Sequence, residues 1–196
     1  TQSLQLNPHN PTAYYRRGIS YSETGKKSLA PADLENATIE ANLLIKNNPN
    51  DAEAYRALAT IYEMQGNHDK ALINYTKAIQ LNPQYAHAYE NRGNVYASKR
   101  LYDQALADYD MAIWLNPQFV RTYIGRGNVY TQAGHYDKAL NDLNFALTLN
   151  PQSVVAYNNR GWVYFNMGDY DRALDDYHRA LAIQPTYKLS IQNIEL

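Results

Sequence analysis

The hydrophobic and polar positions of the chain repeat at a fixed distance along the sequence. Asn-Pro occurs at positions 48, 82, 116 and 150, and Gln-Pro continues the series at position 184, so every step is 34. Between successive prolines lie two stretches in which apolar residues recur at i, i+3, i+4 and i+7, separated by a short polar turn. This spacing is typical of amphipathic helices. The pattern therefore predicts two helices of about twelve residues per unit, folded back on one another as a hairpin.

The prolines also set the boundaries of the units. Four regular units are expected at 52–85, 86–119, 120–153 and 154–187. The preceding unit, 11–51, is longer by seven residues, because the step from Pro8 to Pro49 is 41 instead of 34. The surplus lies at 26–32 and forms either a loop or an added helical turn, since Pro31 suits the start of a helix. Residues 1–10 resemble the end of a preceding unit, and 188–196 the start of a further or capping helix, as in a piece of a longer array.

Residues at both ends of each expected second helix agree with these boundaries. An aspartate stands near the start of the second helix in four units, at Asp69, Asp103, Asp137 and Asp171. A negative charge is favourable there because the helix dipole is positive at its N-terminus. The proline that follows the asparagine then ends the helix, since it cannot donate the next helical hydrogen bond.

The order of large and small residues in each unit resembles the tetratricopeptide repeat family. That repeat has an aromatic residue, a small residue four positions later, a second aromatic, then alanine, aromatic, alanine and proline. In the unit 86–119 these positions are Tyr89, Gly93, Tyr96, Ala105, Tyr109, Ala112 and Pro117. The resemblance implies an all-α fold, a right-handed superhelical solenoid of stacked antiparallel helix hairpins. It also implies that the first helix of each hairpin lines a concave groove.

Composition narrows the range of partners. The chain has 18 basic and 19 acidic residues, a formal net charge of −1, so no basic field exists to hold nucleic acid. No apolar run is long enough for direct membrane insertion, and the N-terminus lacks a signal-peptide pattern. A soluble protein is expected, and its compartment stays open, with the cytoplasm as one option.

No arrangement of residues points to catalysis. The five histidines are isolated from one another, without the i,i+4 partner that a helical zinc site needs. Asp175 and Asp176 are adjacent, but neighbours on a helix point about 100° apart and would not share a proton. Cysteine is absent, which removes thiolate chemistry and disulfides. The sequence therefore predicts neither an enzyme nor a metal or cofactor site.

An arginine recurs beside a glycine in the segments NRGNVY at 91–96, GRGNVY at 125–130 and NRGWVY at 159–164. An aspartate stands at i+16 from each arginine, which gives the candidate pairs Arg92–Asp108, Arg126–Asp142 and Arg160–Asp176. Where Leu58 replaces the arginine, Asn74 replaces the aspartate. Because acid and base change together, we expect structural ion pairs between the two helices of a hairpin, each worth about 1 kcal/mol or less. An arginine that binds a ligand is the alternative.

The variable positions of the first helices predict a peptide-binding groove. Helical geometry places positions 94, 128 and 162 on the groove face, with further groove residues one turn away. The expected groove residues are Asn91, Asn94, Arg121, Ile124, Asn128, Asn158, Trp162 and Phe165. A tryptophan beside amides is typical of a binding hot spot. The prediction is a protein or peptide partner with an apolar anchor across 86–187, unless the segment 188–196 covers Trp162.

Two other functions stay open. Fold alone does not give function, so the array could be a structural spacer or self-association module of a larger protein, with no groove ligand. The family resemblance also implies a clamp for the terminal carboxylate of chaperone tails. Carried over to this chain, its positions are Arg56, Thr60, Asn91, Arg121 and Gly125. Two of the five lack a suitable side chain, which counts against this mode.

On the outer face of the second helices, the two middle units have apolar residues where other units have charged or polar ones. Met111 and Phe145 stand where the first and last regular units have Lys77 and Arg179, and Trp114 stands where Gln80 does. An apolar patch that replaces charges predicts a contact surface and weak homo-oligomerisation. Single exposed hydrophobic side chains are also common on ordinary surfaces, so a neutral surface is the alternative.

Overall fold

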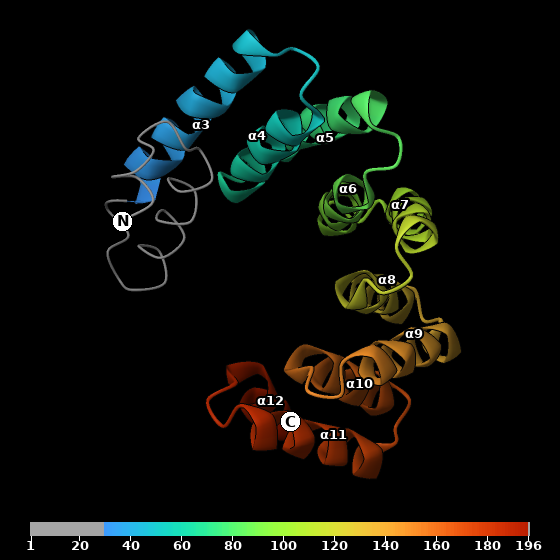
Figure 1. Ribbon diagram of the computed structural model, residues 1–196. Coiled ribbons are helices and arrows are strands. Elements are labelled where there is room, and N and C mark those ends of the chain that lie inside the picture. The colour runs from blue at the N-terminus through green and yellow to red at the C-terminus, as the bar shows by residue number, and fades with distance from the viewer. Residues whose placement is uncertain (1–29, 196) are drawn as a thin grey trace. The chain divides into compact units, whose positions relative to one another are not determined.

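The described residues of the computed structural model, 30–195, form helices joined by short turns (Figure 1). The all-α repeat fold expected from the sequence is thereby confirmed. The chain divides into two compact units between Val95 and Tyr96, a boundary that falls inside α6 (Ala86–Ser98). Within residues 30–195, no helix is both long and apolar enough to cross a bilayer.

Among residues 30–95, the first unit contains three complete helices and the start of α6. These helices are α3 (Ala30–Asn47), α4 (Ala52–Met64) and α5 (His68–Leu81). Residues 30–32 of the seven-residue surplus belong to the first turn of α3, so this part is helical, and 26–29 lie outside the described residues. Leu58 packs against Ala37 and Ala41 of α3. An apolar contact thus occupies the position that arginine holds elsewhere.

The second unit continues the same hairpin pattern. Its helices are α7 (Tyr102–Leu115), α8 (Val120–Gln132), α9 (Tyr136–Leu149), α10 (Val154–Asn166), α11 (Tyr170–Ile183) and α12 (Lys188–Ile194). The hairpin α8–α9 stacks on the hairpin α10–α11 through the contact between α9 and α10. In the same way, α11 packs against α12. The first helices form a second set of contacts, α8 with α10 and α10 with α12.

Asparagine and proline end the second helices together. Asn82, Asn116 and Asn150 are the C-terminal capping residues of α5, α7 and α9. The Oδ1 of each accepts a hydrogen bond from the backbone nitrogen two residues later, at 3.1 Å. The intervening proline has no N–H of its own. Asparagine therefore stabilises the turn, and proline prevents the helix from continuing.

The turn inside each hairpin requires a left-handed backbone. Gly66, Gly134 and Gly168 adopt φ of 74°, 75° and 79° at one repeat position, where glycine has no steric penalty. Arg100 occupies the same position in the unit 86–119, with φ of 59°. A residue with a Cβ in this conformation costs about 1 kcal/mol. The repeat geometry therefore overrides the local preference of this arginine.

The core between successive hairpins is built from one recurring contact. On the second helices α5, α7 and α9, an alanine and a larger residue receive a valine from the next first helix. The sets are Ala71, Tyr75 and Val95; Ala105, Tyr109 and Val129; and Ala139, Leu143 and Val163. We call the alanine and the larger residue of each set a valine seat. All members are buried, so the small alanine lets helices approach while the larger residue fills the space beside it.

Candidate peptide-binding site

Six of the expected groove residues lie on the first helices α8 and α10 of the second unit, and four of these six keep an accessible side chain. Arg121 is exposed, whereas Asn128 and Phe165 are partly buried. Trp162 keeps 39% of its surface exposed. Asn128 and Trp162 occupy the same repeat position on α8 and α10, which contact each other. These helices therefore present amide and aromatic side chains on one continuous surface.

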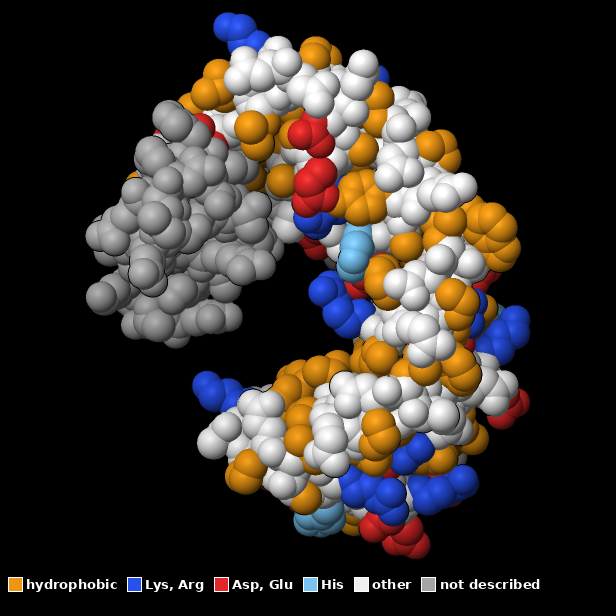
Figure 2. Space-filling view, viewed as in Figure 1, with side chains coloured by type: hydrophobic (Ala, Val, Ile, Leu, Met, Phe, Trp, Pro, Cys, Tyr) orange, Lys and Arg blue, Asp and Glu red, His pale blue; other side chains and the backbone are white. Residues whose placement is uncertain are grey.

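Three aromatic rings form a row at the C-terminal end of α10. The rings of Trp162 and Phe165 stack with centroids 5.4 Å apart and planes 9° apart. Phe165 contacts Tyr170 of α11 edge-on, at 5.5 Å and 66°. Figure 2 shows hydrophobic side chains gathered over α10 and α12. We call Trp162, Phe165 and Tyr170 the aromatic row; its mutual contacts hold an exposed indole in a defined orientation.

Tyr170 was not among the residues expected from the sequence. The side chain of Tyr170 is 60% exposed. The two preceding units also have tyrosine at this repeat position, at Tyr102 and Tyr136. Sequence therefore gives no sign that this copy takes part in a site. Only the phenylalanine at position 165, where the previous unit has Thr131, brings Tyr170 into an aromatic cluster.

The structure corrects the prediction for two of the expected groove residues, Ile124 and Asn158, which are buried. Ile124 is 9% exposed and belongs to the core that includes Ala156. Asn158 is 5% exposed, and its Oδ1 accepts hydrogen bonds from Ser190 Oγ at 3.0 Å and Asn193 Nδ2 at 3.1 Å. Both residues stand where one first helix contacts the next, so the neighbouring helix covers them. The C-terminal helix α12 thus covers Asn158 while Trp162 stays accessible.

Asn91 and Asn94 are partly buried on α6, in the part that belongs to the first unit. Their participation in the same groove as Asn128 and Trp162 stays a prediction.

The recurring arginines of the second unit bind two helices at once. Arg126 donates to Asp142 from Nε at 2.8 Å and from Nη2 at 2.7 Å, and its Nη1 donates to Asp110 at 2.6 Å. Arg160 makes the same paired contact with Asp176, at 2.7 Å for both bonds, and its Nη1 donates to Asn144 at 2.6 Å. Each guanidinium therefore joins the second helix of its own hairpin to that of the preceding one.

These contacts indicate that Arg126 and Arg160 have a structural role and do not bind a ligand. Hydrogen bonds from Arg126 to Asp142 raise the pKa of Arg126 above its ordinary value, and Asp176 does the same for Arg160. Since the donors are already directed at carboxylates, few remain for a ligand. In the first unit, Arg92 Nη1 donates to Thr76 Oγ1 at 3.0 Å, the equivalent contact to the preceding helix. The pair Arg92–Asp108 would join the two units and stays a prediction.

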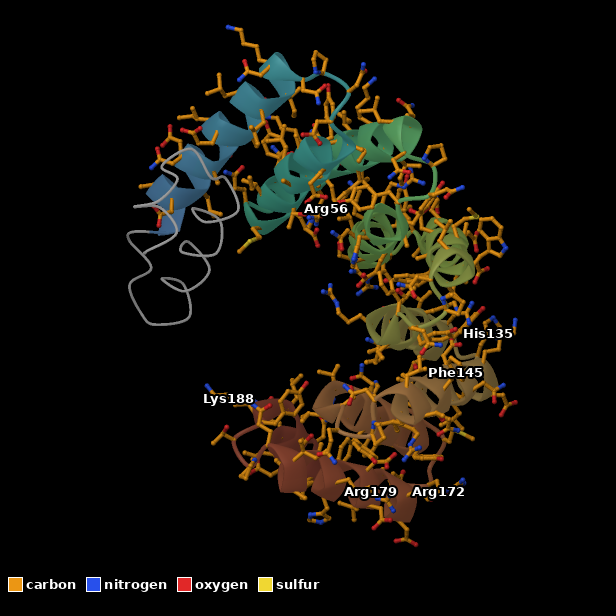
Figure 3. All side chains as sticks on the ribbon, in the orientation of Figure 1. Arg56, His135, Phe145, Arg172, Arg179 and Lys188 are labelled. Atoms are coloured by element: carbon orange, nitrogen blue, oxygen red, sulfur yellow. The ribbon has the colours of Figure 1, made fainter. Side chains whose placement is uncertain are left out.

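The outer face of the second unit exposes the three expected hydrophobic residues. Met111 is 37% exposed, Trp114 73% and Phe145 41%. The Phe145 ring packs 4.7 Å from that of Tyr123, so part of its surface serves the hairpin. Figure 3 shows Phe145 on α9, and Arg179 on α11 at the equivalent repeat position. Trp114 is therefore the residue best suited to a contact outside the chain.

Replacement of Trp114 by glutamate tests whether this patch mediates self-association. We expect a weaker monomer–dimer equilibrium in sedimentation velocity, because a carboxylate at the centre of an apolar contact is costly to desolvate. An equilibrium that matches that of the wild-type protein would rule out the patch as a dimer contact.

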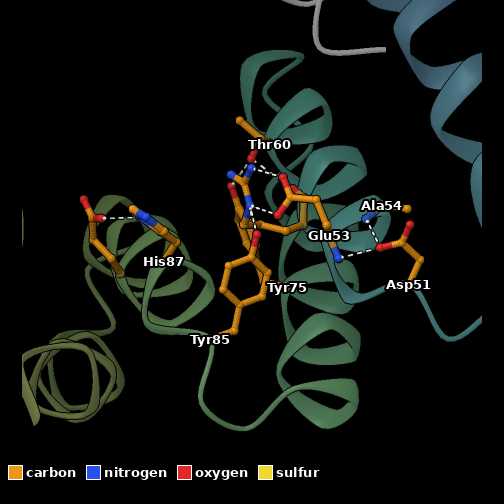
Figure 4. Close-up of polar contacts among 9 residues, drawn as sticks. Asp51, Glu53, Ala54, Thr60, Tyr75, Tyr85 and His87 are labelled. Atoms are coloured by element: carbon orange, nitrogen blue, oxygen red, sulfur yellow. Dashed lines mark hydrogen bonds and ion pairs between the residues drawn. The ribbon is translucent and has the colours of Figure 1, made fainter. Parts of the chain in front are cut away.

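A polar network on the first unit bears on the carboxylate-clamp alternative (Figure 4). Arg56 donates from Nε to Glu53 at 3.1 Å and to the Tyr85 hydroxyl at 2.6 Å. On the same hairpin, the Tyr75 hydroxyl lies 2.9 Å from Thr60 Oγ1 and donates to Glu63 at 2.7 Å. A guanidinium that already binds a carboxylate has little to offer a second one. The geometry therefore counts against a chaperone-tail clamp centred on Arg56.

Family models match most of the described chain. A model described as tetratricopeptide repeat matches residues 52–85, 86–119 and 154–187, and a second, described as TPR repeat, matches 127–168. The first three ranges coincide with three of the units expected from the sequence. No curated protein matches the chain.

Several solved structures share the fold. The thermophilic TPR protein TTC0263 of Thermus thermophilus is 25% identical, with a TM-score of 0.75 over 95% of this chain and 98% of that one. YrrB, described as a TPR protein with an unusual peptide-binding site, is 19% identical, with a TM-score of 0.69 over 100% and 97%. MamA of Desulfovibrio magneticus RS-1 is 18% identical, with a TM-score of 0.71 over 87% and 96%.

Proposed function

Because the chain belongs to the tetratricopeptide repeat family, whose fold is a general scaffold for protein–protein interaction, we propose that it binds a partner peptide across α8 and α10. One observation carries the proposal: Trp162 is exposed yet held in place by stacking on Phe165. A large aromatic side chain that is already ordered loses little conformational entropy on binding. Such residues dominate the energy of protein interfaces.

The neighbouring side chains supply the polar part of the site. The Asn128 amide can donate and accept hydrogen bonds, as the backbone of an extended peptide requires. Arg121 adds a positive charge on the same helix, suited to a carbonyl or carboxylate of the partner. These are groups for binding rather than for bond breaking. The peptide-binding site attributed to YrrB supports peptide recognition as a use of this fold.

Replacement of Trp162 by alanine should weaken peptide binding about thirtyfold, since a hot-spot aromatic residue contributes about 2 kcal/mol. Replacement of Asn128 by alanine should weaken it about fivefold, the value of one hydrogen bond. The probe is a phage-displayed library of random dodecapeptides, selected on the wild-type protein. Synthetic copies of the enriched peptides are then titrated by fluorescence anisotropy.

Trp114→Ala is the matched control, because it removes the other tryptophan of the chain, on the outer face. We expect it to bind the enriched peptides as the wild type does. Circular dichroism verifies that all three variants keep their helix content. If the enriched peptides bind Trp162→Ala with the same affinity as they bind the wild type, the spacer or self-association function is favoured instead. A library that yields no enriched peptide leads to the same conclusion.

A further inference from the structure

Among the four regular units, one lacks the buried tyrosine that the other three carry on the second helix. The tyrosines are Tyr75 on α5, Tyr109 on α7 and Tyr177 on α11, whereas α9 has Leu143 at the same repeat position. None of these four side chains is more than 1% exposed. Leucine fills the core as tyrosine does, but it has no hydroxyl group. The hairpin α8–α9 therefore lacks one buried polar group.

In the hairpin α4–α5, this hydroxyl binds the groove side of the first helix. The Tyr75 hydroxyl lies 2.9 Å from Thr60 Oγ1 (Figure 4) and donates to Glu63 at 2.7 Å. Thr60 stands at the repeat position of Asn128 and Trp162. The buried tyrosine thus reaches the groove position of its own hairpin from the core side, and it uses part of the hydrogen-bonding capacity there.

On α8, Asn128 occupies this groove position with Leu143 in place of the tyrosine. Leu143 packs under Gly127, the residue before Asn128, where a Cβ atom would lie 3.1 Å from Leu143 Cγ. Leucine offers Asn128 neither a donor nor an acceptor. Within residues 30–195, the side-chain amide of Asn128 makes no hydrogen bond, although it is partly buried. Its N–H groups and its carbonyl oxygen are therefore left for water or a ligand.

The surface beside Asn128 favours the main chain of a peptide as that ligand. Gly125 precedes Asn128 by one turn on the same face of α8. It has no side chain, and a Cβ atom there would lie 3.0 Å from the Tyr109 ring. A peptide backbone can therefore approach α8 closely at this point. A carboxamide presents donors and an acceptor, and a peptide group has one of each, so the two can form paired hydrogen bonds.

We propose that Leu143 determines where the partner peptide is held: by replacing tyrosine it leaves the Asn128 amide open, and Asn128 binds a main-chain amide group of the peptide. The proposal rests on the proposed function and adds a specificity-determining residue and the chemistry of its contact. Leu143 is a positioning residue, because it acts through Asn128 and is itself buried.

Restoring the tyrosine tests this role. Leu143→Tyr should weaken binding of the peptides enriched on the wild-type protein about fivefold, because its hydroxyl would bind Asn128 as Tyr75 binds Thr60. Leu143→Phe is the matched control: it adds the same ring without the hydroxyl and should bind as the wild type does. Combined with Asn128→Ala, Leu143→Tyr should cause no further loss, since the amide it would engage is gone.

Both rings should fit the core of the second unit. Two of the valine seats already contain a tyrosine, Tyr75 under Val95 and Tyr109 under Val129. Circular dichroism and urea unfolding verify that Leu143→Tyr and Leu143→Phe fold to the same extent, so that a difference in binding reports on the hydroxyl alone.

Peptide variants test the contact without any change in the core. Methylating the backbone nitrogens of an enriched peptide one at a time removes one donor each, and one position should cost about fivefold on the wild-type protein. The same methylated peptide should lose nothing further on Asn128→Ala, because the bond is already absent. Replacing asparagine or glutamine residues of the peptide by alanine should leave this coupling in place.

The outcomes separate this proposal from the broader one. Equal affinities of Leu143→Tyr and Leu143→Phe, with binding still dependent on Trp162, would overturn the role of Leu143 and leave the proposed function standing. Coupling of Asn128 to a carboxamide side chain of the peptide, and to no methylated nitrogen, would overturn the main-chain contact. Peptides indifferent to Trp162 would refute the proposed function itself. A selection without enriched peptides would contradict both.

Discussion

Replacement of Arg126 by methionine should lower the free energy of unfolding by about 3 kcal/mol, the usual loss when one partner of a buried ion pair is removed. Asp142 is 6% exposed, so without the guanidinium its carboxylate would stay buried with its main partner gone. Methionine keeps most of the apolar stem of arginine, and the loss therefore reports on the charge rather than on packing.

Equilibrium urea unfolding, followed by circular dichroism, measures this loss. Arg179→Met is the matched control: Arg179 is 57% exposed and lies 3.5 Å from the exposed Asp175, so its removal should cost less than about 0.5 kcal/mol. Equal effects of the two changes would contradict a structural role for Arg126. In the double variant with Asp142→Leu, most of the lost stability should return, because no unpaired charge stays buried.

The hydrogen bond from Arg126 to Asp110 limits how much stability an exchange of the Arg126–Asp142 charges can restore. Exchanging Arg126 and Asp142 for a glutamate and an arginine rebuilds the pair within the hairpin, but the new glutamate then faces Asp110. Like charges at this distance repel. We therefore expect the exchange to restore stability only in part, and to restore more of it when Asp110 is changed to asparagine as well.

Gly161→Val should also destabilise the second unit by about 3 kcal/mol, at the upper end of what overpacking costs. A Cβ atom on Gly161 would lie 2.7 Å from Tyr177 Cε1 and 3.1 Å from the backbone oxygen of Ala173. The ring can move, but the backbone oxygen cannot. Ala59 stands at the equivalent position opposite Tyr75, so the α4–α5 hairpin accommodates a Cβ atom there. At Gly161 the Cβ atom already meets the ring, and the two methyl groups of valine add to the clash.

The same substitution at Gly127 is the comparison. A Cβ there would lie 3.1 Å from Leu143 Cγ and 3.4 Å from the Ala139 oxygen, so the flexible leucine can give way. The cost should be about 1 kcal/mol. Thermal and urea unfolding of the two variants measure the difference. A Gly127→Val variant as unstable as Gly161→Val would contradict the role assigned to the Tyr177 ring.

The fold could be predicted because each unit repeats the same physical constraints. The constant period, the Asn-Pro stops and the helical spacing of apolar residues all depend on short stretches of sequence. The partners of Arg126 and Arg160 within a hairpin could be found as well, since acid and base change together. Their second contacts, to Asp110 and Asn144, depend on how one hairpin stacks on the next. In the sequence, the residues that make these second contacts do not change together with the arginines, so the contacts could not be predicted.

The candidate site was harder to predict for the same reason. A helical wheel for a single first helix places Ile124 and Asn158 beside the groove, but it ignores the next first helix, which covers both. The replacement of tyrosine by Leu143 can be read from the sequence, since the other three regular units have tyrosine at this position. That the hydroxyl of such a tyrosine binds the groove position of its hairpin, as Tyr75 binds Thr60, is visible only in the packed structure.

The location of the binding site can be measured directly, because the chain has two tryptophans, one on the first-helix face at Trp162 and one on the outer face at Trp114. Each gives one indole N–H signal in a ¹⁵N–¹H correlation spectrum, assigned by replacing either residue with phenylalanine. Titration with a peptide enriched on the wild-type protein should shift the Trp162 signal and leave that of Trp114 in place. A shift of the Trp114 signal with Trp162 unmoved would contradict a peptide site on α8 and α10.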